Sequence, residues 1–228
     1  ATTEIYTLSQ HDALPISLTP VQEEMDQYML VPIEGLPGFH GGAVGYLAYD
    51  TIRYFEPRVP EMPADPVGVP ESVFMFCDTL LLFDHVRHDI KVVSHVRLNG
   101  DIEQAYAKAT AKIDEMVARL SRPLELPPEL QSNDAQKFVS SEIESNQTKD
   151  RYAKMIGRCI DYIYAGDMIQ ITYSQRFSRR TEAHPFQIYR ALRSINPSPY
   201  MYYLNLDDFQ IRSAEHTSEL QSRTNIVC

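Results

Sequence analysis

The segment YIYAGDMIQITYSQRF, residues 162–177, decides how the second half of the chain is built. It starts with the pattern of a helix end and finishes with the pattern of a strand. Gly166 stands where a left-handed residue ends a helix, since glycine adopts a positive φ at no steric cost. One face of the predicted strand carries Met168, Gln170, Thr172 and Ser174, and the other carries Ile169, Ile171, Tyr173 and Gln175. The amide of Gln170, placed in an apolar run, is therefore the first candidate for a functional side chain.

The residues around this segment continue a mixed pattern of helices and strands. Thr148 can cap a helix with apolar residues at helical spacing, namely Tyr152, Met155, Ile156, Cys159, Ile160 and Ile163. Residues 184–195, HPFQIYRALRSI, predict a second helix. The following NPSPY, residues 196–200, predicts a rigid turn, and MYYLNL, residues 201–206, another strand. This order predicts α+β architecture, with an antiparallel or mixed sheet packed against helices.

The first half of the chain shows the same mixture. Residues 18–29 predict a short helix, and GGAVGYLAYD, residues 41–50, a turn that leads into a buried strand. The runs VFMFCDTLLLFD, residues 73–84, and IKVVSHVRL, residues 90–98, predict an antiparallel hairpin. Asp101 then opens a helix with Gln104 three residues later, a variant of the capping box. The predicted apolar face of this helix consists of Ile102, Tyr106, Ile113, Met116 and Leu120.

The chain divides into five parts by composition. Residues 17–122 form one predicted region, the Pro- and Ser-rich residues 123–147 a connector, and residues 148–212 a second region. The ends, residues 1–16 and 213–228, resemble peptides translated from sequencing-adapter DNA, and both are polar and aperiodic. We expect these ends to be foreign and to pack against nothing, whereas natural flexible ends are the alternative. Residues 17–212 are then expected to be cut from a longer protein.

Composition excludes several classes of function. With 43% hydrophobic and 23% charged residues among 228, the chain has the composition of a globular protein. A net charge of -10 with scattered Lys and Arg residues argues against a nucleic-acid partner. No apolar run approaches the roughly 20 residues that span a membrane. The three cysteines lie far apart and favour reduced thiols, and no secretory signal is visible, so we expect a cytoplasmic protein without nucleic-acid or membrane partners.

Other candidate residues have simpler interpretations. The sequence contains no P-loop, no GxGxxG and no HExxH pattern. Asp167 is predicted to be a turn residue, and Tyr46, Tyr49 and Asp50 are predicted to be core and turn residues. Four histidines have no acid or nucleophile at a telling spacing and are predicted to be structural or exposed: His40, His85, His88 and His95.

Three of these segments, taken together, resemble a known family. GGAVGYLAYDTIRYFE, residues 41–56, is similar to the N-terminal region of the anthranilate synthase large subunit (component I). YIYAGDMIQITYSQRF resembles the opening of the chorismate-binding domain in the same enzymes, and NPSPYMYYLNL, residues 196–206, resembles the motif that follows it. The related aminodeoxychorismate synthases share the first two segments, whereas the third favours anthranilate synthase. The resemblance covers most of residues 17–212.

The resemblance implies an activity. The family converts chorismate and ammonia to anthranilate and pyruvate, a lyase reaction of tryptophan biosynthesis that uses Mg²⁺, and a glutamine amidotransferase subunit supplies the ammonia. In related enzymes a lysine at the position of Gln170 activates water. An amide only donates and accepts hydrogen bonds, so the resemblance implies that Gln170 orients ammonia. The alternative is an amide that is satisfied in the core or faces solvent.

The resemblance also implies regulation by L-tryptophan. In the family the NPSPYM segment lines the pocket of this feedback inhibitor, and Pro199, Tyr200 and Met201 match the contacts, with Asn196 and Pro197 close by. A rigid backbone beside an aromatic ring and a thioether suits a flat indole. The alternative is a rigid turn with no ligand.

Parts of the family pattern have no counterpart in this sequence. The carboxylates that hold Mg²⁺ in the family lie further along its sequence, so we expect no metal ligands in this chain and no activity from the chain alone. Two other functions stay open at this point. One is an aminodeoxychorismate synthase of the folate pathway, and the other is a non-catalytic amino-acid-sensing module.

Overall fold

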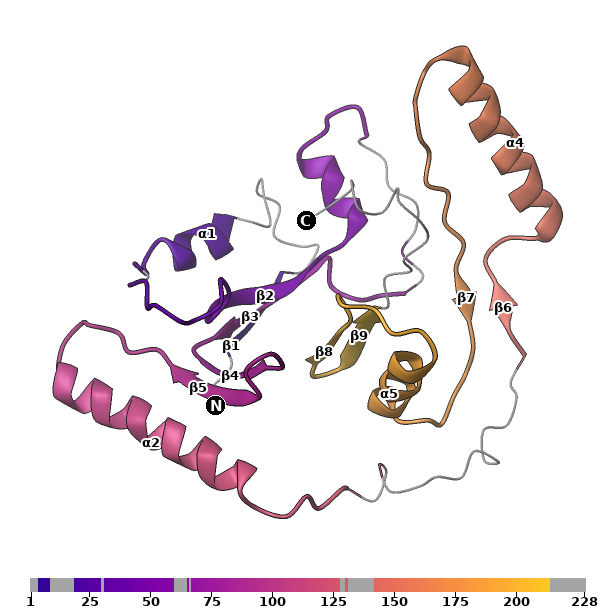
Figure 1. The fold of residues 1–228 in the computed structure, drawn as a ribbon. Coiled ribbons are helices and arrows are strands. Elements are labelled where there is room, and N and C mark those ends of the chain that lie inside the picture. Colours follow the sequence, from indigo (N-terminus) through magenta and orange to yellow (C-terminus); the bar gives the residue numbers. More distant parts are fainter. Residues whose placement is uncertain are drawn as a thin grey trace. The chain divides into compact units, whose positions relative to one another are not determined.

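The computed structural model describes residues 4–8, 19–29, 31–59, 65, 67–127, 130 and 142–213. The chain divides into two compact units. The first contains residues 1–124 and 204–211, and the second contains residues 125–203 and 212–228. Helices and small antiparallel sheets alternate along the chain, so the predicted α+β class is confirmed (Figure 1).

The first unit is built on a three-stranded sheet. Its strands are β1 (Glu4–Leu8), β2 (Gly42–Leu47) and β3 (Ser72–Cys77), in the order β1-β3-β2, and both pairings are antiparallel. Gly45 of β2 lies opposite Phe74, and Tyr46 lies opposite Val73. Val73 is 2% exposed, which places part of the core of this unit at the central strand.

The pairing of β1 corrects one expectation. Residues 1–16 were expected to pack against nothing, but Glu4–Leu8 pairs along its whole length with β3. The segment EIYTL contains the β-branched and aromatic residue types that favour strands, and the edge of β3 that faces away from β2 offers backbone groups that a further strand can pair. Residues 1–3, 9–16 and 214–228 lie outside the described residues, and Ser213, the first residue of the other predicted end, belongs to a strand. The foreign origin of the two ends stays a prediction.

The run predicted as one strand over residues 73–84 is two strands. Asp78 separates β3 from β4 (Thr79–Asp84), and β4 pairs with β5 (Asp89–Ser94) instead of continuing the first sheet. A period of two marks a strand but does not say which neighbour it pairs with, so the sequence pattern could not show the break. The predicted hairpin is confirmed, with Asp84 opposite Asp89 across its turn.

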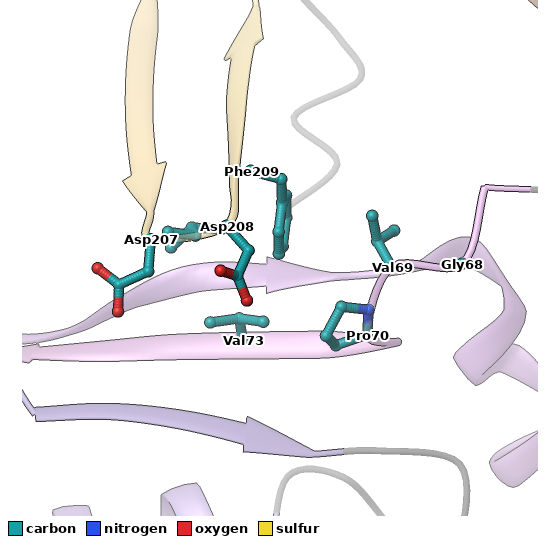
Figure 2. A pocket seen from close by; sticks show the side chains of 8 residues that line it. Gly68, Val69, Pro70, Val73, Asp207, Asp208 and Phe209 are labelled. Carbon is teal, nitrogen blue, oxygen red and sulfur yellow. The ribbon is translucent and has the colours of Figure 1, made fainter.

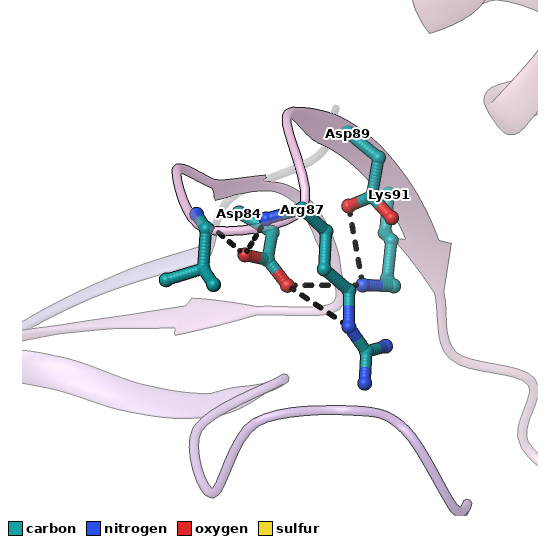
Figure 3. A network of polar contacts seen from close by, with 5 residues as sticks. Asp84, Arg87, Asp89 and Lys91 are labelled. Carbon is teal, nitrogen blue, oxygen red and sulfur yellow. Dashed lines mark hydrogen bonds and ion pairs between the residues drawn. The ribbon is translucent and has the colours of Figure 1, made fainter.

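A network of polar contacts holds this turn (Figure 3). The Asp84 carboxylate accepts hydrogen bonds from the backbone N–H groups of Val86 and Arg87, both at 3.0 Å. Lys91 lies 3.7 Å from Asp84 and 3.2 Å from Asp89. The Arg87 N–H, more than the nearby cations, lowers the pKa of Asp84. These contacts stabilise the turn, which contains a residue with a left-handed backbone, His88 at φ 58°.

Helix α2 (Ile102–Leu120) packs against β5, and the apolar face predicted for it is only partly buried. Its predicted cap is confirmed, because the Asp101 side chain accepts a hydrogen bond from the Gln104 N–H at 3.0 Å. Ile113 and Met116 of that face are half-buried, whereas Ile102, Tyr106 and Leu120 are 53%, 67% and 45% exposed. The buried residue of the helix is Ala109, which was not predicted. A small side chain lets a helix approach a sheet closely. The spacing of apolar residues alone does not reveal this, because it takes no account of side-chain size.

An ion pair links α2 to the break between β3 and β4. Lys112 Nζ lies 2.7 Å from an Asp78 carboxylate oxygen, and the Thr79 hydroxyl donates to the other at 2.8 Å. Partial burial alone would raise the pKa of Asp78, but the hydrogen bonds from Lys112 and Thr79 outweigh burial and lower it. Asp78 thus joins helix and sheet at the point where the chain changes sheets.

Four further elements belong wholly or largely to the first unit. Helix α1 (Thr19–Met25) ends earlier than the predicted Met29. The 3₁₀ helix η1 (Tyr49–Tyr54) follows β2, and its Arg53 forms an ion pair with Glu71 just before β3. Strands β8 (Tyr202–Leu206) and β9 (Phe209–Ser213) form a two-stranded sheet. The first of these strands was predicted, whereas β9 was not.

The second unit contains β6 (Glu144–Ser145), α4 (Lys149–Ala165), β7 (Phe177–Ser178) and α5 (Pro185–Ile195). Both predicted helices are confirmed. The predicted strand over residues 168–177 is wrong, because only Phe177 and Ser178 form ladder pairs, with Ser145 and Glu144. An extended segment counts as a strand only where a neighbour pairs with it. Strand β6 itself lies in the predicted connector.

None of the helices in the described part of the chain combines the length and apolar character needed to cross a membrane.

Candidate functional site

The turn before Gln170 is built as the sequence predicts. The Thr148 hydroxyl begins α4 by accepting a hydrogen bond from the Arg151 N–H at 3.2 Å. Gly166 ends the helix with φ 83°. Its N–H donates to the Ile163 carbonyl and the Asp167 N–H to the Tyr162 carbonyl, both at 3.1 Å. These two bonds define a Schellman motif, so Asp167 is a turn residue as predicted.

The segment after this turn has two different faces. From Ile171 to Gln175, side chains alternate between half-buried and exposed, as a strand-like backbone requires. Tyr173 is on the half-buried face, and its ring lies 5.2 Å from that of Tyr152 on α4. Gln170 is in phase with the exposed face and is itself exposed. The structure therefore presents this amide at the surface of the described part, and its role in orienting ammonia stays a prediction.

The second predicted site is the turn between α5 and β8. Asn196 caps the end of α5, with its N–H donating to the Leu192 carbonyl at 2.8 Å. The Tyr200 N–H approaches the Ser198 hydroxyl at 3.4 Å. Tyr200 is 73% exposed, whereas Met201 is half-buried. Pro197 and Pro199 are exposed on the same turn.

Three aromatic rings on either side of this turn pack together. Tyr203, two residues after Met201, lies 5.4 Å from the ring of Phe186 and 5.6 Å from that of Tyr189. Phe186 and Tyr189 are three residues apart on α5, so they share one face of the helix. This cluster fixes the start of β8 against α5 and thereby holds both ends of the predicted tryptophan-binding turn. Sequence reasoning missed it, although the spacing of the two rings is a visible signal.

A cavity of about 320 Å³ lies in the first unit (Figure 2). Its apolar walls include Val73 of β3 and Phe209 of β9, and Asp207 and Asp208 of the intervening turn line its edge. Figure 2 shows the Asp208 carboxylate directed toward Val73. The ring of Tyr46 lies edge-on to Phe209 at 6.0 Å. None of the site residues predicted from the sequence lines this cavity.

Tyr46 supports this region structurally. Its hydroxyl donates to the Pro70 carbonyl at 2.5 Å, and burial raises the pKa of the phenol. A phenol that is held by a carbonyl and made harder to ionise is a poor proton donor to substrate. The prediction of Tyr46 as a core residue agrees with this geometry, while Tyr49 is 83% exposed on η1.

A second cavity, of about 300 Å³, lies along the end of α4. It is lined by Arg158, Asp161, Tyr162, Ala165 and Asp167. Asp167 is the nearest lining residue in sequence to Gln170, which does not line this cavity. The charges are mixed, with one guanidinium and two carboxylates.

The histidines divide as predicted into structural and exposed residues. His85 and His88 are exposed on the β4–β5 turn. His40 is 8% exposed, its ring stacks on that of His95 at 5.8 Å, and His95 Nε2 lies 2.6 Å from the His40 carbonyl oxygen. A β-carbon on Gly41 would lie 2.2 Å from His95 Nε2, so a larger residue at this position would displace the His95 ring.

The described residues do not form a metal site. Within those parts of the chain, no group of three or more His, Cys, Asp or Glu side chains is placed to hold a metal ion. Mg²⁺ prefers oxygen ligands in a near-octahedral arrangement. The described residues therefore do not fit Mg²⁺.

Comparison with known proteins shows which family this chain matches. The family model described as "chorismate binding enzyme" matches residues 2–220. The probable anthranilate synthase component 1 of Schizosaccharomyces pombe is 42% identical over 201 residues, covering 86% of this chain and 40% of that protein. Anthranilate synthase component 1 of Pseudomonas putida is 33% identical over 225 residues, covering 95% of this chain and 45% of that protein. The chain thus spans less than half the length of these relatives.

A solved structure supports the fold. Anthranilate synthase component I from Streptococcus pneumoniae TIGR4 superposes with a TM-score of 0.69 over 92% of this chain and 49% of that one. The two sequences are 24% identical in this comparison. The likeness extends across both units and establishes a shared fold.

Proposed function

The chain belongs to the chorismate binding enzymes, and we propose that it forms part of the large subunit of an anthranilate synthase. The observation that carries this proposal is the 42% identity over 201 residues to the S. pombe protein of that name. The NPSPYM segment supports the same choice over the sibling aminodeoxychorismate synthases. The complete enzyme would convert chorismate and ammonia to anthranilate and pyruvate in tryptophan biosynthesis.

The source of ammonia in this proposal is a partner subunit. The relatives are named as component 1 or alpha subunit, which supports an enzyme assembled from more than one component. The partner's role is to release ammonia from glutamine. Ammonia is already a nucleophile, so the large subunit has to bind and orient it and has little need to deprotonate it.

Gln170 is the residue of this chain proposed to orient ammonia. Its amide oxygen can accept a hydrogen bond from ammonia, and its amide nitrogen can donate one to a substrate oxygen. A side chain that lacks a titratable proton does not activate water as a base would. Gln170 follows the Gly166 turn and stays on the exposed face of its segment, where it is free to contact a ligand.

The turn at residues 196–201 is proposed to bind tryptophan as a feedback inhibitor. Pro199, Tyr200 and Met201 would contact the indole, with Asn196 and Pro197 beside them. The exposed ring of Tyr200 and the half-buried thioether of Met201 support an aromatic ligand. The ring cluster of Phe186, Tyr189 and Tyr203 supports the turn from behind.

The involvement of Mg²⁺ in the proposed reaction rests only on the family resemblance. The described residues do not fit the ion, so the roles proposed for this part of the chain do not involve it. That the chain alone lacks turnover remains a prediction.

The role of Gln170 is tested in the complete enzyme with ammonium as the nitrogen source. Losing one hydrogen bond to a neutral group costs about 1 kcal/mol, so we expect Gln170→Ala to lower kcat/KM for ammonia by somewhat less than about tenfold. Gln170→Lys adds a potential base and should yield some hydroxylated product, detected by mass spectrometry. Gln104→Ala, at an exposed position on α2, is the matched control and should leave kcat/KM unchanged. Unchanged ammonia kinetics in Gln170→Ala would overturn the assigned role.

A further inference from the structure

The residues before α4 hold the segment that carries Gln170. Ser145 and Glu144 of β6 pair with Phe177 and Ser178 of β7. The side chain of Ser145 adds a further contact, because its hydroxyl accepts a hydrogen bond from the Gln175 amide at 2.7 Å. On one side, these contacts involve residues 144 and 145, shortly before the Thr148 cap of α4. On the other side they involve residues 175–178. These contacts between residues 144–146 and 175–178, here called the clamp, tie the segment to the start of the helix.

Asn146 forms the centre of this clamp. Its backbone N–H donates to the Arg176 carbonyl at 3.1 Å. Its side-chain oxygen accepts from the Arg176 N–H at 3.0 Å. One residue thus satisfies both backbone groups of Arg176, the second through its side chain where a regular ladder would use a carbonyl. Among common side chains, only a short acceptor on this backbone position reproduces the bond.

A clamp with this geometry fixes which face of the segment carries Gln170. Side chains on an extended backbone alternate, so a slip of one residue moves every side chain to the opposite face. In the present register, Tyr173 contacts Tyr152 and Gln175 contacts Ser145. Gln170 has the opposite phase and remains exposed. After a slip of one residue, the Gln170 amide would point to the opposite side of the segment from the one it faces now.

We propose that Asn146 is a positioning residue that sets the register of residues 170–178 and so determines the direction in which Gln170 presents its amide. The inference rests on the proposed function for its consequence in catalysis, but the register itself is independent of that function. Asn146 touches neither chorismate nor ammonia in this mechanism. It acts through the backbone of Arg176.

Disulfide trapping in the chain tests the register. Cys77, Cys159 and Cys228 are first replaced by alanine. Glu144→Cys is then paired with Ser178→Cys, which matches the present register, or with Arg179→Cys, which matches a slip of one residue. We expect the first pair to cross-link and the second to lag by about tenfold, the order of magnitude that the one hydrogen bond to the Asn146 side chain supplies. Adding Asn146→Leu should bring the two rates together, whereas Asn146→Asp, which keeps the acceptor, should preserve the difference.

A measurement on the unaltered chain guards against a variant that fails to fold. The Arg176 amide should exchange with solvent more slowly than the Thr172 and Ser174 amides of the same segment. If the Arg176 amide exchanges as fast as these, or if Asn146→Leu leaves the cross-linking ratio unchanged, the positioning role is overturned.

Kinetics of the complete enzyme separate this role from the proposed function. Asn146→Leu should lower kcat/KM for ammonia to the level of Gln170→Ala, and the double variant should lose little more, because both changes remove the same orientation. Asn146→Asp should rescue the rate, and Asn99→Ala, at an exposed asparagine outside the clamp, should have no effect. If Gln170→Ala has no effect, the role proposed for Gln170 fails while the cross-linking still decides the register. If Asn146→Leu shifts the register without changing ammonia kinetics, the positioning role for catalysis fails.

Discussion

Gly45→Ala tests how closely β2 and β3 pack. A β-carbon built on Gly45 would lie 1.9 Å from the Val73 carbonyl oxygen and 2.8 Å from the α-carbon of Phe74. Both atoms belong to the backbone of the neighbouring strand, so no side-chain rotation relieves the contact. A comfortable carbon–oxygen separation is about 3.3 Å, so the strands would have to move apart by more than about an ångström.

The cost follows from this displacement. Overpacking a well-packed site costs about 1–3 kcal/mol, and this contact belongs at the upper end because it also loosens the ladder beside Val73, which is 2% exposed. We expect the free energy of unfolding to fall by about 3 kcal/mol. Urea unfolding followed by circular dichroism and tyrosine fluorescence measures the change, since the chain contains no tryptophan.

Gly38→Ala is the matched control. A β-carbon on Gly38 would meet no atom within 4 Å, so its free energy of unfolding should stay within about 0.5 kcal/mol of the unaltered chain. Equal urea midpoints for Gly45→Ala, Gly38→Ala and the unaltered chain would refute the close approach of β2 to β3.

Three further changes have defined outcomes. The lowered pKa of Asp78 means that its contribution to stability is present above the unfolded pKa of about 3.9 and is lost as pH falls through the lower folded pKa. Asp78→Asn should therefore lower the free energy of unfolding by under about 1 kcal/mol at neutral pH and weaken its fall at acidic pH, measured by urea titration. An unchanged fall at acidic pH would contradict the Lys112 contact. On α4, Gly166→Ala should destabilise by about 1 kcal/mol through its φ of 83°, whereas Gly157→Ala in the helix interior should stabilise by about 0.5–1 kcal/mol; thermal melts in which both shift the same way would argue against the cap. In the complete enzyme, Met201→Thr should raise the tryptophan concentration for half inhibition and leave uninhibited turnover nearly unchanged; lost turnover with normal tryptophan sensitivity would place the turn in the catalytic site or the core.

Local signals in the sequence predicted local structure well. Thr148 and Gly166 bound α4 as expected, because a cap depends on one side chain or one backbone angle that the residue type restricts. The Asp101 cap and the β4–β5 hairpin follow for the same reason. The alternation of side chains from Ile171 to Gln175 was also predictable, since it needs only an extended backbone, but the exposed position of Gln170 was not.

Contacts and strand pairing between residues far apart in the sequence were not predictable in the same way. The break at Asp78 and the pairing of β1 with β3 depend on which strand edge is free, and a single strand's pattern holds no information on this. The burial of Ala109 depends on which side of α2 packs against β5. The contact of Asn146 with Arg176 joins residues 30 positions apart, so the role of Asn146 became visible only in the structure.

Product identification from the complete protein decides whether this chain belongs to an anthranilate synthase. The purified protein is given chorismate, ammonium and Mg²⁺, and products are separated by chromatography and identified by fluorescence and mass. Anthranilate and pyruvate in equal amounts, with formation suppressed by tryptophan, are the expected result. An amino product substituted at a different ring position, formed without anthranilate and unaffected by tryptophan, would contradict it and assign the chain to the sibling synthase.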